Sequence, residues 1–584
     1  MPTVRIPLVG SFTQRGLSGS AALVLNEDQR FLNCCFEVIT NPITGKSSVY
    51  LSKRPGWGQD SIVAAGSAST GLCKPQSFAA TLTAFGETNS VIYHGTGSIG
   101  TITGRALHMT ETLISGVGNV AIKSSDGSGW YYASDAKTVT AYTGFTSSGS
   151  TIVSTISSVG GMYIGQLITG NTIGAGARIS TITGSTSTIV LTVASTATST
   201  GVALTKEPIA NIISPNFVTT GSSISAFRAL DGYLFYTTDD GYINNSDLNS
   251  ISSYSANARV AVQQSPDPAV AVEVQKETVL AFGFNSNQKF QNQGYSTGSP
   301  LQVIKSAVDH IGAIDQRSVT GIEDDLFYVA APSEGDVGVY RMRGLVSTRI
   351  STIAVDKIIG TVAASGAIYA SSFRLGGYAY AAFVLSTAQD GPASMILLES
   401  GDNILLESGN KLLLEDTVAQ IASFVRMLVY NATLNIWSEW DCNQATFIYG
   451  ISSGTANTLL ATSRMNTSGK VYTINPVAYG QLYQDDGATF NAEIRTAKID
   501  HGTGDRKFVE NIILNGDVQP AGTVTLECSD DDYSTWTTLG TFDLTKQRPK
   551  ITRCGSYIGG RAYRLTHSYN GAFRAESIEI TYSM

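Results

Sequence analysis

Short apolar runs rich in aromatic residues alternate with turn-forming residues along most of this chain. Clear cases lie at 90–94 (SVIYH), 129–133 (GWYYA), 278–284 (TVLAFGF), 325–330 (DLFYVA) and 377–384 (GYAYAAFV). At 232–243 (GYLFYTTDDGYI) two such runs flank Asp-Asp-Gly, the composition of a tight hairpin turn. No amphipathic pattern of about 12 residues or more interrupts the series. The pattern therefore predicts an all-β chain that contains a sandwich or a propeller.

The charge content narrows the possible functions. Lys and Arg number 38 against 46 Asp and Glu, a net charge of −8, and no run of basic residues occurs. Tight nucleic-acid binding needs clustered cations, so the sequence disfavours it. Charged residues are only 14% of the chain, but hydrophobic residues are 42%, which is enough to form cores and argues against disorder. The composition does not fit a helical enzyme.

Changes in composition divide the chain into four parts. Residues 1–60 show little alternation and end in Lys-Arg-Pro-Gly-Trp, which predicts an extended docking segment. Residues 61–137 and 206–480 are expected to form a β-propeller. Residues 138–205 are expected to be a small inserted β domain, and residues 481–584 a C-terminal domain resembling a β-sandwich, because charged residues become much denser there.

Two segments have an unusual amino-acid composition or pattern. Residues 138–205 carry one charge, Arg178, and resemble the small β modules inserted into phage structural proteins. A disordered linker is the alternative, but Ile and Val recur there with period two, which favours strands. Residues 396–415 repeat ILLESG with Gly401 and Gly409 between the copies, which predicts three short strands rather than a helix.

Targeting signals are not expected. The first residues lack the apolar core of a signal peptide, and no apolar stretch is long enough for a membrane helix. The six cysteines are scattered, which predicts reduced thiols in a product made in the cytoplasm. They are Cys34, Cys35, Cys73, Cys442, Cys528 and Cys554.

Two short motifs resemble catalytic or cofactor-binding signatures. Gly95–Gly100 spells G-x-G-x-x-G, but the β-branched residues that follow do not start the helix a dinucleotide site needs. Gly294–Gly298 spells G-x-S-x-G around Ser296, but Ser-Pro follows instead of a helix. Both are therefore interpreted as turns or loops.

Other candidate residues also lack the spacing that chemistry requires. The histidines, His94, His108, His310, His501 and His567, are isolated from one another and from cysteines, so no zinc pattern exists. Cys34-Cys35 is interpreted as two small apolar residues. The pairs Asp239-Asp240, Asp324-Asp325 and Asp485-Asp486 are interpreted as turns. We therefore predict no catalytic, cofactor-binding or metal-binding residue and no cofactor.

The run Asp530-Asp531-Asp532 lies in SDDDYSTW and resembles the Asp-box turn of sialidase-type propellers, with Tyr533 where Gly is expected. In such a turn a carboxylate accepts hydrogen bonds from backbone N–H groups and stabilises a hairpin. Three adjacent carboxylates are ligands that calcium prefers, but the D-x-D-x-D-G spacing of a calcium loop is missing.

Four segments, in this order, resemble the packaged-DNA stabilisation proteins, the tail hub or nozzle proteins of short-tailed phages (podoviruses). They are 28–57 (DQRFLNCCFEV…GKSSVYLSKRPGW), 279–359 (VLAFGF…RISTIAVDKII), 430–441 (YNATLNIWSEWD) and 529–565 (SDDDYSTW…GGRAYRL). The resemblance spans most of the chain apart from 138–205. The chain departs from the family pattern at two places. Tyr533 replaces the usual Gly, and Cys554-Gly555 lies in a stretch that is usually basic.

The resemblance implies a non-enzymatic structural subunit of the virion tail, assembled in the host cytoplasm. It implies a homohexameric ring below the portal and adaptor that continues the DNA conduit, retains packaged DNA and opens for ejection. Partners would be the adaptor ring, tail fibres or tailspikes, and double-stranded DNA in passage without sequence-specific binding. A net-acidic wall suits such passage because it repels phosphates.

The sequence leaves two alternative functions open. A tail-fibre or receptor-binding protein would fit the inserted module and the 26 tyrosines, although no repetitive shaft is present. A propeller glycosidase would fit the Asp-box, although no carboxylate pair stands out.

Overall fold

The computed structural model describes most of the chain. It covers residues 3–9, 29–386 and 425–584, apart from internal gaps at 41–44, 46, 64–70, 76–77, 79–83, 89, 137–141, 213–221, 263–264, 266, 296, 306, 308, 332–336, 364–366, 442–447, 454–458, 464–468 and 475–482. The repeat at 396–415 therefore lies outside the described residues. The chain is almost entirely β-structure, which confirms the predicted class.

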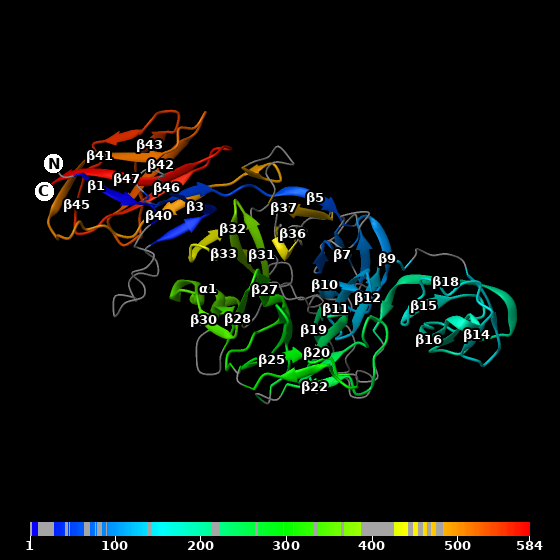
Figure 1. Ribbon diagram of the computed structural model, residues 1–584. Coiled ribbons are helices and arrows are strands. Elements are labelled where there is room, and N and C mark those ends of the chain that lie inside the picture. The colour runs from blue at the N-terminus through cyan, green and yellow to red at the C-terminus, as the bar shows by residue number, and fades with distance from the viewer. Residues whose placement is uncertain are drawn as a thin grey trace, which may run out of the picture.

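The strand pairing of the described residues gives seven four-stranded antiparallel units. They lie at the centre of the molecule (Figure 1). The first four are β6 (Leu72–Cys73), β7 (Phe85–Thr88), β8 (Val91–His94) and β9 (Gly97–Thr101); β10 (Ala106–Ile114), β11 (Val117–Ser124), β12 (Gly129–Ala133) and β18 (Ser199–Asn211); β19 (Ile224–Leu230), β20 (Tyr233–Thr238), β21 (Tyr242–Asn245) and β22 (Arg259–Ala261); and β23 (Ala271–Gln275), β24 (Thr278–Phe282), β25 (Asn287–Asn292) and β26 (Leu301–Val303).

The other three units complete the ring. They are β27 (Val319–Ile322), β28 (Asp325–Ala330), β29 (Gly338–Arg343) and β30 (Val346–Arg349); β31 (Ala367–Leu375), β32 (Tyr378–Ser386), β33 (Val425–Asn431) and β34 (Ile436–Trp440); and β35 (Ile448–Ser453), β36 (Leu459–Ser463), β37 (Lys470–Thr473) and β5 (Gly58–Ile62). Five of these units are sheets of their own, and the second and sixth extend into larger sheets.

The apolar clusters show that the units are blades of a closed propeller. One buried cluster lies between each unit and the next, because the apolar side chains of both faces of a blade need a neighbour to cover them. The last cluster joins Leu460 and Val471 of the seventh unit to Leu72 of the first. The first strands of consecutive units also contact one another around the ring. The predicted propeller is confirmed.

The N-terminal residues hold distant parts of the chain together. β5 pairs with β37, so a strand from the N-terminal region closes the last blade. β1 (Thr3–Pro7) pairs with β47 (Arg574–Ser583), and β3 (Cys34–Thr40) and β4 (Ser47–Lys53) lie in the same sheet. The described part of residues 1–60 thus forms strands that pair within the sheets of the chain itself, and the docking role expected for this segment stays a prediction.

The C-terminal residues form two sheets around a shared apolar core (Figure 1). The first holds β3, β4, β47, β1, β41 (Arg506–Gly516), β44 (Lys550–Thr552) and β45 (Ser556–Ile558). The second continues blade six through β2 (Arg30–Leu32) into β40 (Ala492–Arg495), β46 (Ala562–His567), β42 (Thr523–Ser529) and β43 (Thr537–Asp543). The short hairpin of β38 (Gln484–Asp485) and β39 (Ala488–Thr489) precedes them.

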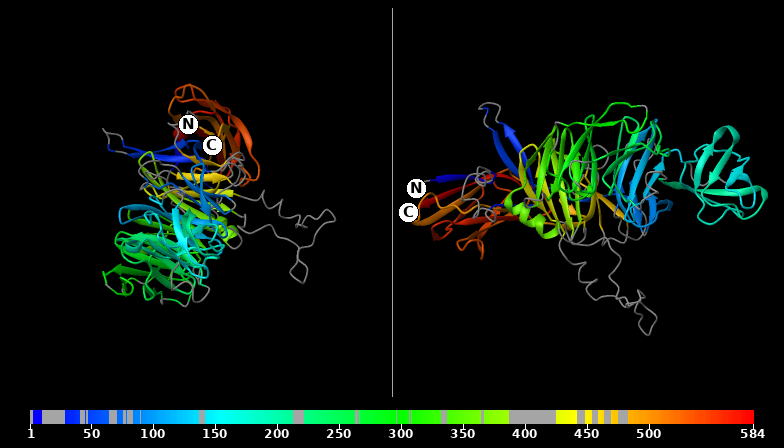
Figure 2. Two further views of the ribbon diagram at one scale, coloured as in Figure 1. Left: turned by 90° about the vertical axis from the view of Figure 1, so that its right-hand side faces the viewer. Right: turned by 90° about the horizontal axis from the view of Figure 1, so that it is seen from below.

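The inserted β module projects from the propeller on the side away from the C-terminal sheets (Figure 2). It contains β13 (Tyr142–Thr146), β14 (Ile152–Ser154), β15 (Gln166–Thr169), β16 (Ile179–Thr183), the 3-10 turn η5 (Gly184–Thr186) and β17 (Thr188–Leu191), around its own core. β18 begins in this module and ends beside β12 in blade two. The module and the blade therefore share one continuous strand.

One α-helix occurs in the described ranges, α1 (Ile353–Ala363), which packs on blades five and six. Its 11 residues are fewer than the amphipathic stretch of about 12 that marks a helix in a sequence. Thr352 caps it by accepting a hydrogen bond from the N–H of Val355 (3.4 Å). No helix in the described part of the chain is long and apolar enough to span a bilayer.

Candidate functional site

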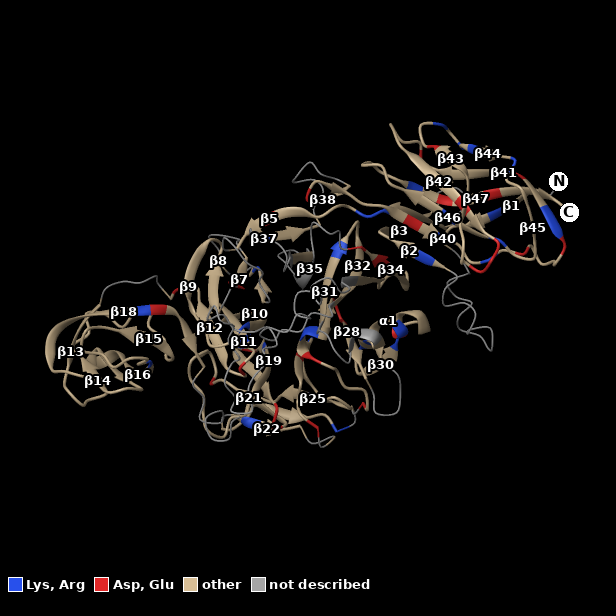
Figure 3. Ribbon diagram, turned by 180° about the vertical axis from the view of Figure 1, so that it is seen from behind, with Lys and Arg blue, Asp and Glu red and all other residues tan. Residues whose placement is uncertain are grey.

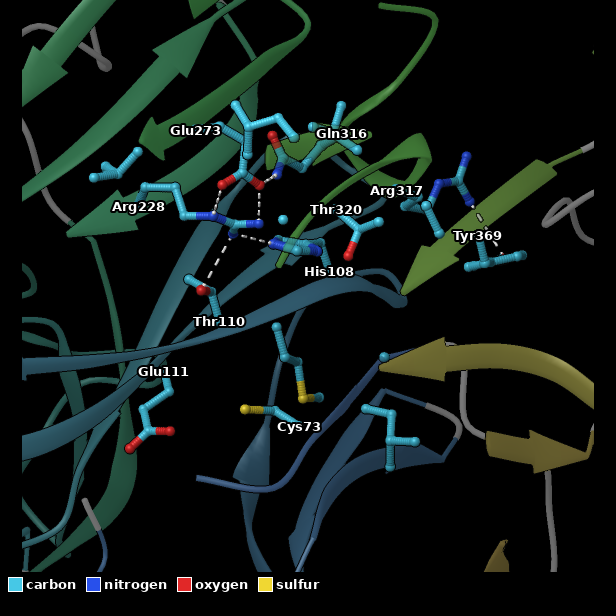
Figure 4. Close-up of a pocket in the computed structure, with 18 of the residues that line it drawn as sticks. Cys73, His108, Thr110, Glu111, Arg228, Glu273, Gln316, Arg317, Thr320 and Tyr369 are labelled. Atoms are coloured by element: carbon cyan, nitrogen blue, oxygen red, sulfur yellow. Dashed lines mark hydrogen bonds and ion pairs between the residues drawn. The ribbon is translucent and has the colours of Figure 1, made fainter. Parts of the chain in front are cut away.

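The propeller axis holds a cleft of about 440 Å³. Side chains from the first strands of the blades line it, because these strands are the innermost of each blade. Three cations and three carboxylates face it: Lys74, Arg228, Arg317, Glu111, Glu273 and Glu323. Figure 4 labels four of them, Glu111 from β10, Arg228 from β19, Glu273 from β23 and Arg317 from the 3-10 turn η6 (Gln316–Ser318), together with Tyr369 from β31.

An ion pair between Arg228 and Glu273 joins blade three to blade four across this cleft. Arg228 Nε donates to Glu273 Oε2 at 2.8 Å, and its terminal nitrogen contacts the other carboxylate oxygen. The remaining guanidinium nitrogen has two hydrogens and three acceptors within reach, which are the Phe227 carbonyl (2.9 Å), the Thr110 hydroxyl (3.2 Å) and the ring nitrogen Nε2 of His108 (2.9 Å), so at least one hydrogen is shared. Every nitrogen of Arg228 is therefore engaged (Figure 4).

His108 of blade two is held neutral by burial and by the same arginine. The Arg228 guanidinium lies 2.9 Å from His108 Nε2, and an arginine can only donate, so Nε2 accepts and carries no proton. Burial, with Arg228 and Lys123 nearby, holds the pKa of His108 well below its usual value. The ring therefore stays uncharged at neutral pH.

Gln316 and Arg317 extend the network to blades five and six. Gln316 Nε2 donates to Glu273 at 3.2 Å, while its oxygen accepts from the N–H of Val272 at 2.9 Å. Arg317 pairs with Asp315 and donates to the Tyr369 hydroxyl at 3.4 Å. Polar contacts thus run from blade two to blade six around the axis, and their chemical effect is to cross-link neighbouring blades.

We expect Glu273→Gln to lower the free energy of unfolding by about 1–3 kcal/mol, because it leaves the half-buried Arg228 without its counter-charge. Urea unfolding measures the change. The matched control is Glu323→Gln on the same wall, whose exposed pair with Arg374 should contribute no more than about 1 kcal/mol. Equal losses in the two variants would contradict a structural role for the axial network.

Cys73 also lines the cleft, but its thiol is not poised to react. Burial raises its pKa to about 12, with Glu111 adding to the effect. The other free thiols in the described residues, Cys34, Cys35, Cys528 and Cys554, are buried and have raised pKa values as well.

We therefore expect iodoacetamide at neutral pH to leave these five cysteines essentially unlabelled in the native protein and to label them all in urea. Peptide mass spectrometry after brief exposure reads out each cysteine separately. Rapid native labelling of Cys73 would show that the axial cleft supplies a reactive thiolate.

The structure places the sequence motifs mainly in turns. Gly95–Gly100 spans the hairpin between β8 and β9. Ser296 lies outside the described residues. His94 stacks on Phe85 and His501 on Tyr582. Within the described ranges, no group of three or more His, Cys, Asp or Glu side chains could hold a metal ion.

Asp531 has the geometry of a turn-stabilising carboxylate. It accepts hydrogen bonds from the N–H and hydroxyl of Thr535 and from the hydroxyl of Ser529, which lowers its pKa to about 2. Asp530 pairs instead with Arg561. Tyr533 has φ +67°, a left-handed conformation that explains why the family pattern has Gly there.

Sequence reasoning missed the buried ion pair between Arg54 and Asp485. Both side chains are fully buried, and the guanidinium meets the carboxylate through two bonds of 2.9 and 2.7 Å. Arg54 Nε also donates to Asn33 (2.8 Å), and the N–H of Trp57 donates to Asp485 (3.0 Å). The pair lies where the closing strand β5, blade six and the C-terminal sheets meet.

Gly56 of the same segment explains part of its sequence. A Cβ at this position would lie 2.0 Å from the Gln484 carbonyl oxygen, so only glycine lets the two backbones approach. The Arg-Pro-Gly-Trp motif and the Asp485-Asp486 turn, which lie more than 400 residues apart in the sequence, thus form one junction.

The family model for "Bacteriophage P22 Gp10, beta-propeller" matches residues 149–371. This confirms the resemblance inferred from the sequence, and the matched range begins inside the module that the quoted motifs leave out. No curated protein sequence matches the chain.

Solved structures match the chain at low similarity. Streptogramin B lyase has a TM-score of 0.34 and 9% identity, over 72% of this chain and 97% of that one. The N-terminal domain of Nup159 has a TM-score of 0.32 and 8% identity, over 76% of this chain and 98% of that one. The endosialidase of phage phi92 has a TM-score of 0.24 and 9% identity, over 90% of this chain and 71% of that one. Likenesses of this size carry no conclusion about activity.

Proposed function

We propose, on the premise that residues 149–371 belong with the propellers of the Bacteriophage P22 Gp10 family, that this chain is a structural subunit of a phage tail. The family match carries the proposal. The axial site supports it, because its polar groups are engaged with one another and cross-link the blades. Such a site stabilises a scaffold rather than turning over a substrate.

In the finer form of the proposal, six copies form a nozzle ring below the portal and adaptor. The ring would continue the DNA conduit, retain the packaged DNA and open for ejection. The conduit would run between subunits, because the axial cleft of about 440 Å³ in one propeller has the size of a small-molecule pocket. The net charge of −8 suits a wall past which phosphates slide.

Particles that lack this protein test the proposal. We expect heads to fill with DNA and then to lose it, and restored protein to prevent that loss. Cryo-electron microscopy of complete virions should place the chain in a six-fold ring on the tail axis. Particles that keep their DNA without the protein, or a position away from the axis, would overturn the nozzle role.

A tail-fibre or receptor-binding role is the second candidate. The observation that favours it is the inserted module, which projects from the propeller and carries a single charge, Arg178, in residues 138–205 (Figure 1). Native mass spectrometry separates the two roles, since six copies support the nozzle and three copies support a fibre. Depolymerisation of host polysaccharide by the purified protein would instead indicate a glycosidase.

A further inference from the structure

The inserted module is joined to blade two by backbone pairing on both edges of one strand. β18 runs from the module into the blade, where its residue Ala210 lies opposite Tyr131 of β12. On the other edge of β18, the same Ala210 lies opposite Gln166 of β15, which belongs to the module. The first residue of β15 therefore extends the sheet of blade two, so the pairing continues across the boundary between the two parts.

The loop that leads into β15, residues 161–166, packs directly on the blade. The Tyr131 hydroxyl of β12 donates a hydrogen bond to the carbonyl of Ile164. The side-chain amide of Gln166 donates to the carbonyl of Pro208 in β18 at 3.1 Å. Side chains as well as backbone pairing thus hold this loop against blade two.

Gly165 allows the closest approach between the module and the blade. Its φ is +89°, and a Cβ at this position would lie 1.8 Å from the carbonyl oxygen of Asn211. The Asn211 N–H donates to the Gly165 carbonyl at 3.1 Å. Any other residue at this position would push the two backbones apart and break that hydrogen bond.

The single charge of the module is directed at the same junction. Residues 138–205 contain no charged residue except Arg178, and Figure 3 shows how little of the module is coloured as charged. The Arg178 guanidinium lies 4.7 Å from the ring centre of Trp130 in β12, and it donates to the Gly165 carbonyl at 2.9 Å. Trp130 is buried, and contacts between a cation and an aromatic ring strengthen when they are shielded from water.

We propose that the inserted module is rigidly attached to blade two, and that Arg178 is the positioning residue that fixes its orientation. Relative motion is the usual expectation for two parts joined by segments with few contacts. Here the pairing of β15 with β18, the approach at Gly165 and the Arg178 contacts oppose such motion. The far surface of the module then has a fixed place relative to the propeller, whether or not the chain forms a nozzle.

Distances between two spin labels test the attachment in the full chain. One label is placed by Thr186→Cys in the exposed η5 turn of the module, and the other by Thr101→Cys at an exposed position of β9 in blade one. Cys442→Ser removes the cysteine outside the described residues, and the five cysteines within them are buried. We expect double electron–electron resonance to give one narrow distance distribution.

Two variants locate the contacts that hold the module. Arg178→Ala removes the guanidinium but keeps the backbone bridge to Leu167, and it should widen the distance distribution about twofold or more. Gly165→Val should also shift the mean distance, because its side chain would meet the backbone of the blade. The matched control is Arg259→Ala in blade three, where the guanidinium lies 4.6 Å from the Tyr242 ring centre, and it should leave the distribution unchanged.

Hydrogen exchange separates a loss of orientation from unfolding of the module. Protection of the amides in β13 and β17 should keep its native level in Arg178→Ala. Loss of that protection would mean that Arg178 stabilises the fold of the module itself, which would overturn its positioning role. A broad distance distribution in the presence of Arg178, or equal widths in Arg178→Ala and Arg259→Ala, would also overturn the proposal.

Discussion

Replacing Asp485 by asparagine is expected to lower the free energy of unfolding by about 3–5 kcal/mol. The substitution keeps the volume of the side chain but leaves the Arg54 guanidinium fully buried without its counter-charge. An unpaired charge costs most where water cannot reach it, and both side chains of this pair have no exposed surface. Trp440 lies 5.8 Å from the guanidinium, so tryptophan fluorescence during urea unfolding reports on this junction.

Asp486→Asn is the matched control for this prediction. Asp486 makes a part-exposed pair with Lys470 at 2.9 Å, and its loss should cost no more than about 1 kcal/mol. A double variant, Arg54→Met with Asp485→Leu, removes both charges and should recover part of the stability lost in Asp485→Asn. Equal losses in Asp485→Asn and Asp486→Asn would show that the buried pair does not stabilise the junction.

Local patterns made the fold class predictable. Period-two alternation and turn residues act over a few positions, and they identify strands such as β20 and β28 directly from the sequence. The Asp531 turn was predictable for the same reason, since its partners Ser529 and Thr535 lie within four residues.

Long-range pairing was not predictable from one sequence. Thr3 lies opposite Thr581, and Ile62 opposite Lys470, so the N-terminal residues take part in sheets whose other strands are hundreds of residues away. Weak alternation in residues 1–60 indicated an extended segment, but tertiary pairing decides the conformation of such sequences.

The candidate sites depend on the same long-range assembly. His108, Arg228 and Glu273 are isolated in the sequence and meet only because the blades close around an axis. Asp485 has the sequence of a turn residue, and it does precede a tight turn, but its role follows from Arg54, which approaches from the other end of the chain. A signal was present in Arg54-Pro55-Gly56-Trp57, although only the structure shows its partner.

Acid is expected to destabilise the C-terminal domain through His567. Its ring is fully buried in β46, stacks on Phe573 and has no hydrogen-bond partner among the described residues for either nitrogen. Burial, with Lys53 nearby, lowers its pKa to about 4. The unfolded chain binds a proton from about pH 6.5, but the folded chain binds it only near pH 4. Stability should therefore fall by about 3 kcal/mol as the pH falls through this window.

Replacing His567 by phenylalanine separates this effect from the titration of carboxylates. The variant has no group that titrates at this position, so its urea-unfolding free energy should fall about 3 kcal/mol less than that of the native sequence between about pH 7 and pH 4. His310→Gln, at an exposed histidine, is the matched control and should keep the native pH dependence. If His567→Phe loses as much stability in acid as the native chain, the acid sensitivity arises elsewhere. If the dependence of the unfolding free energy on pH is flattened in His567→Phe alone, a single buried imidazole sets the pH range in which the two C-terminal sheets stay packed.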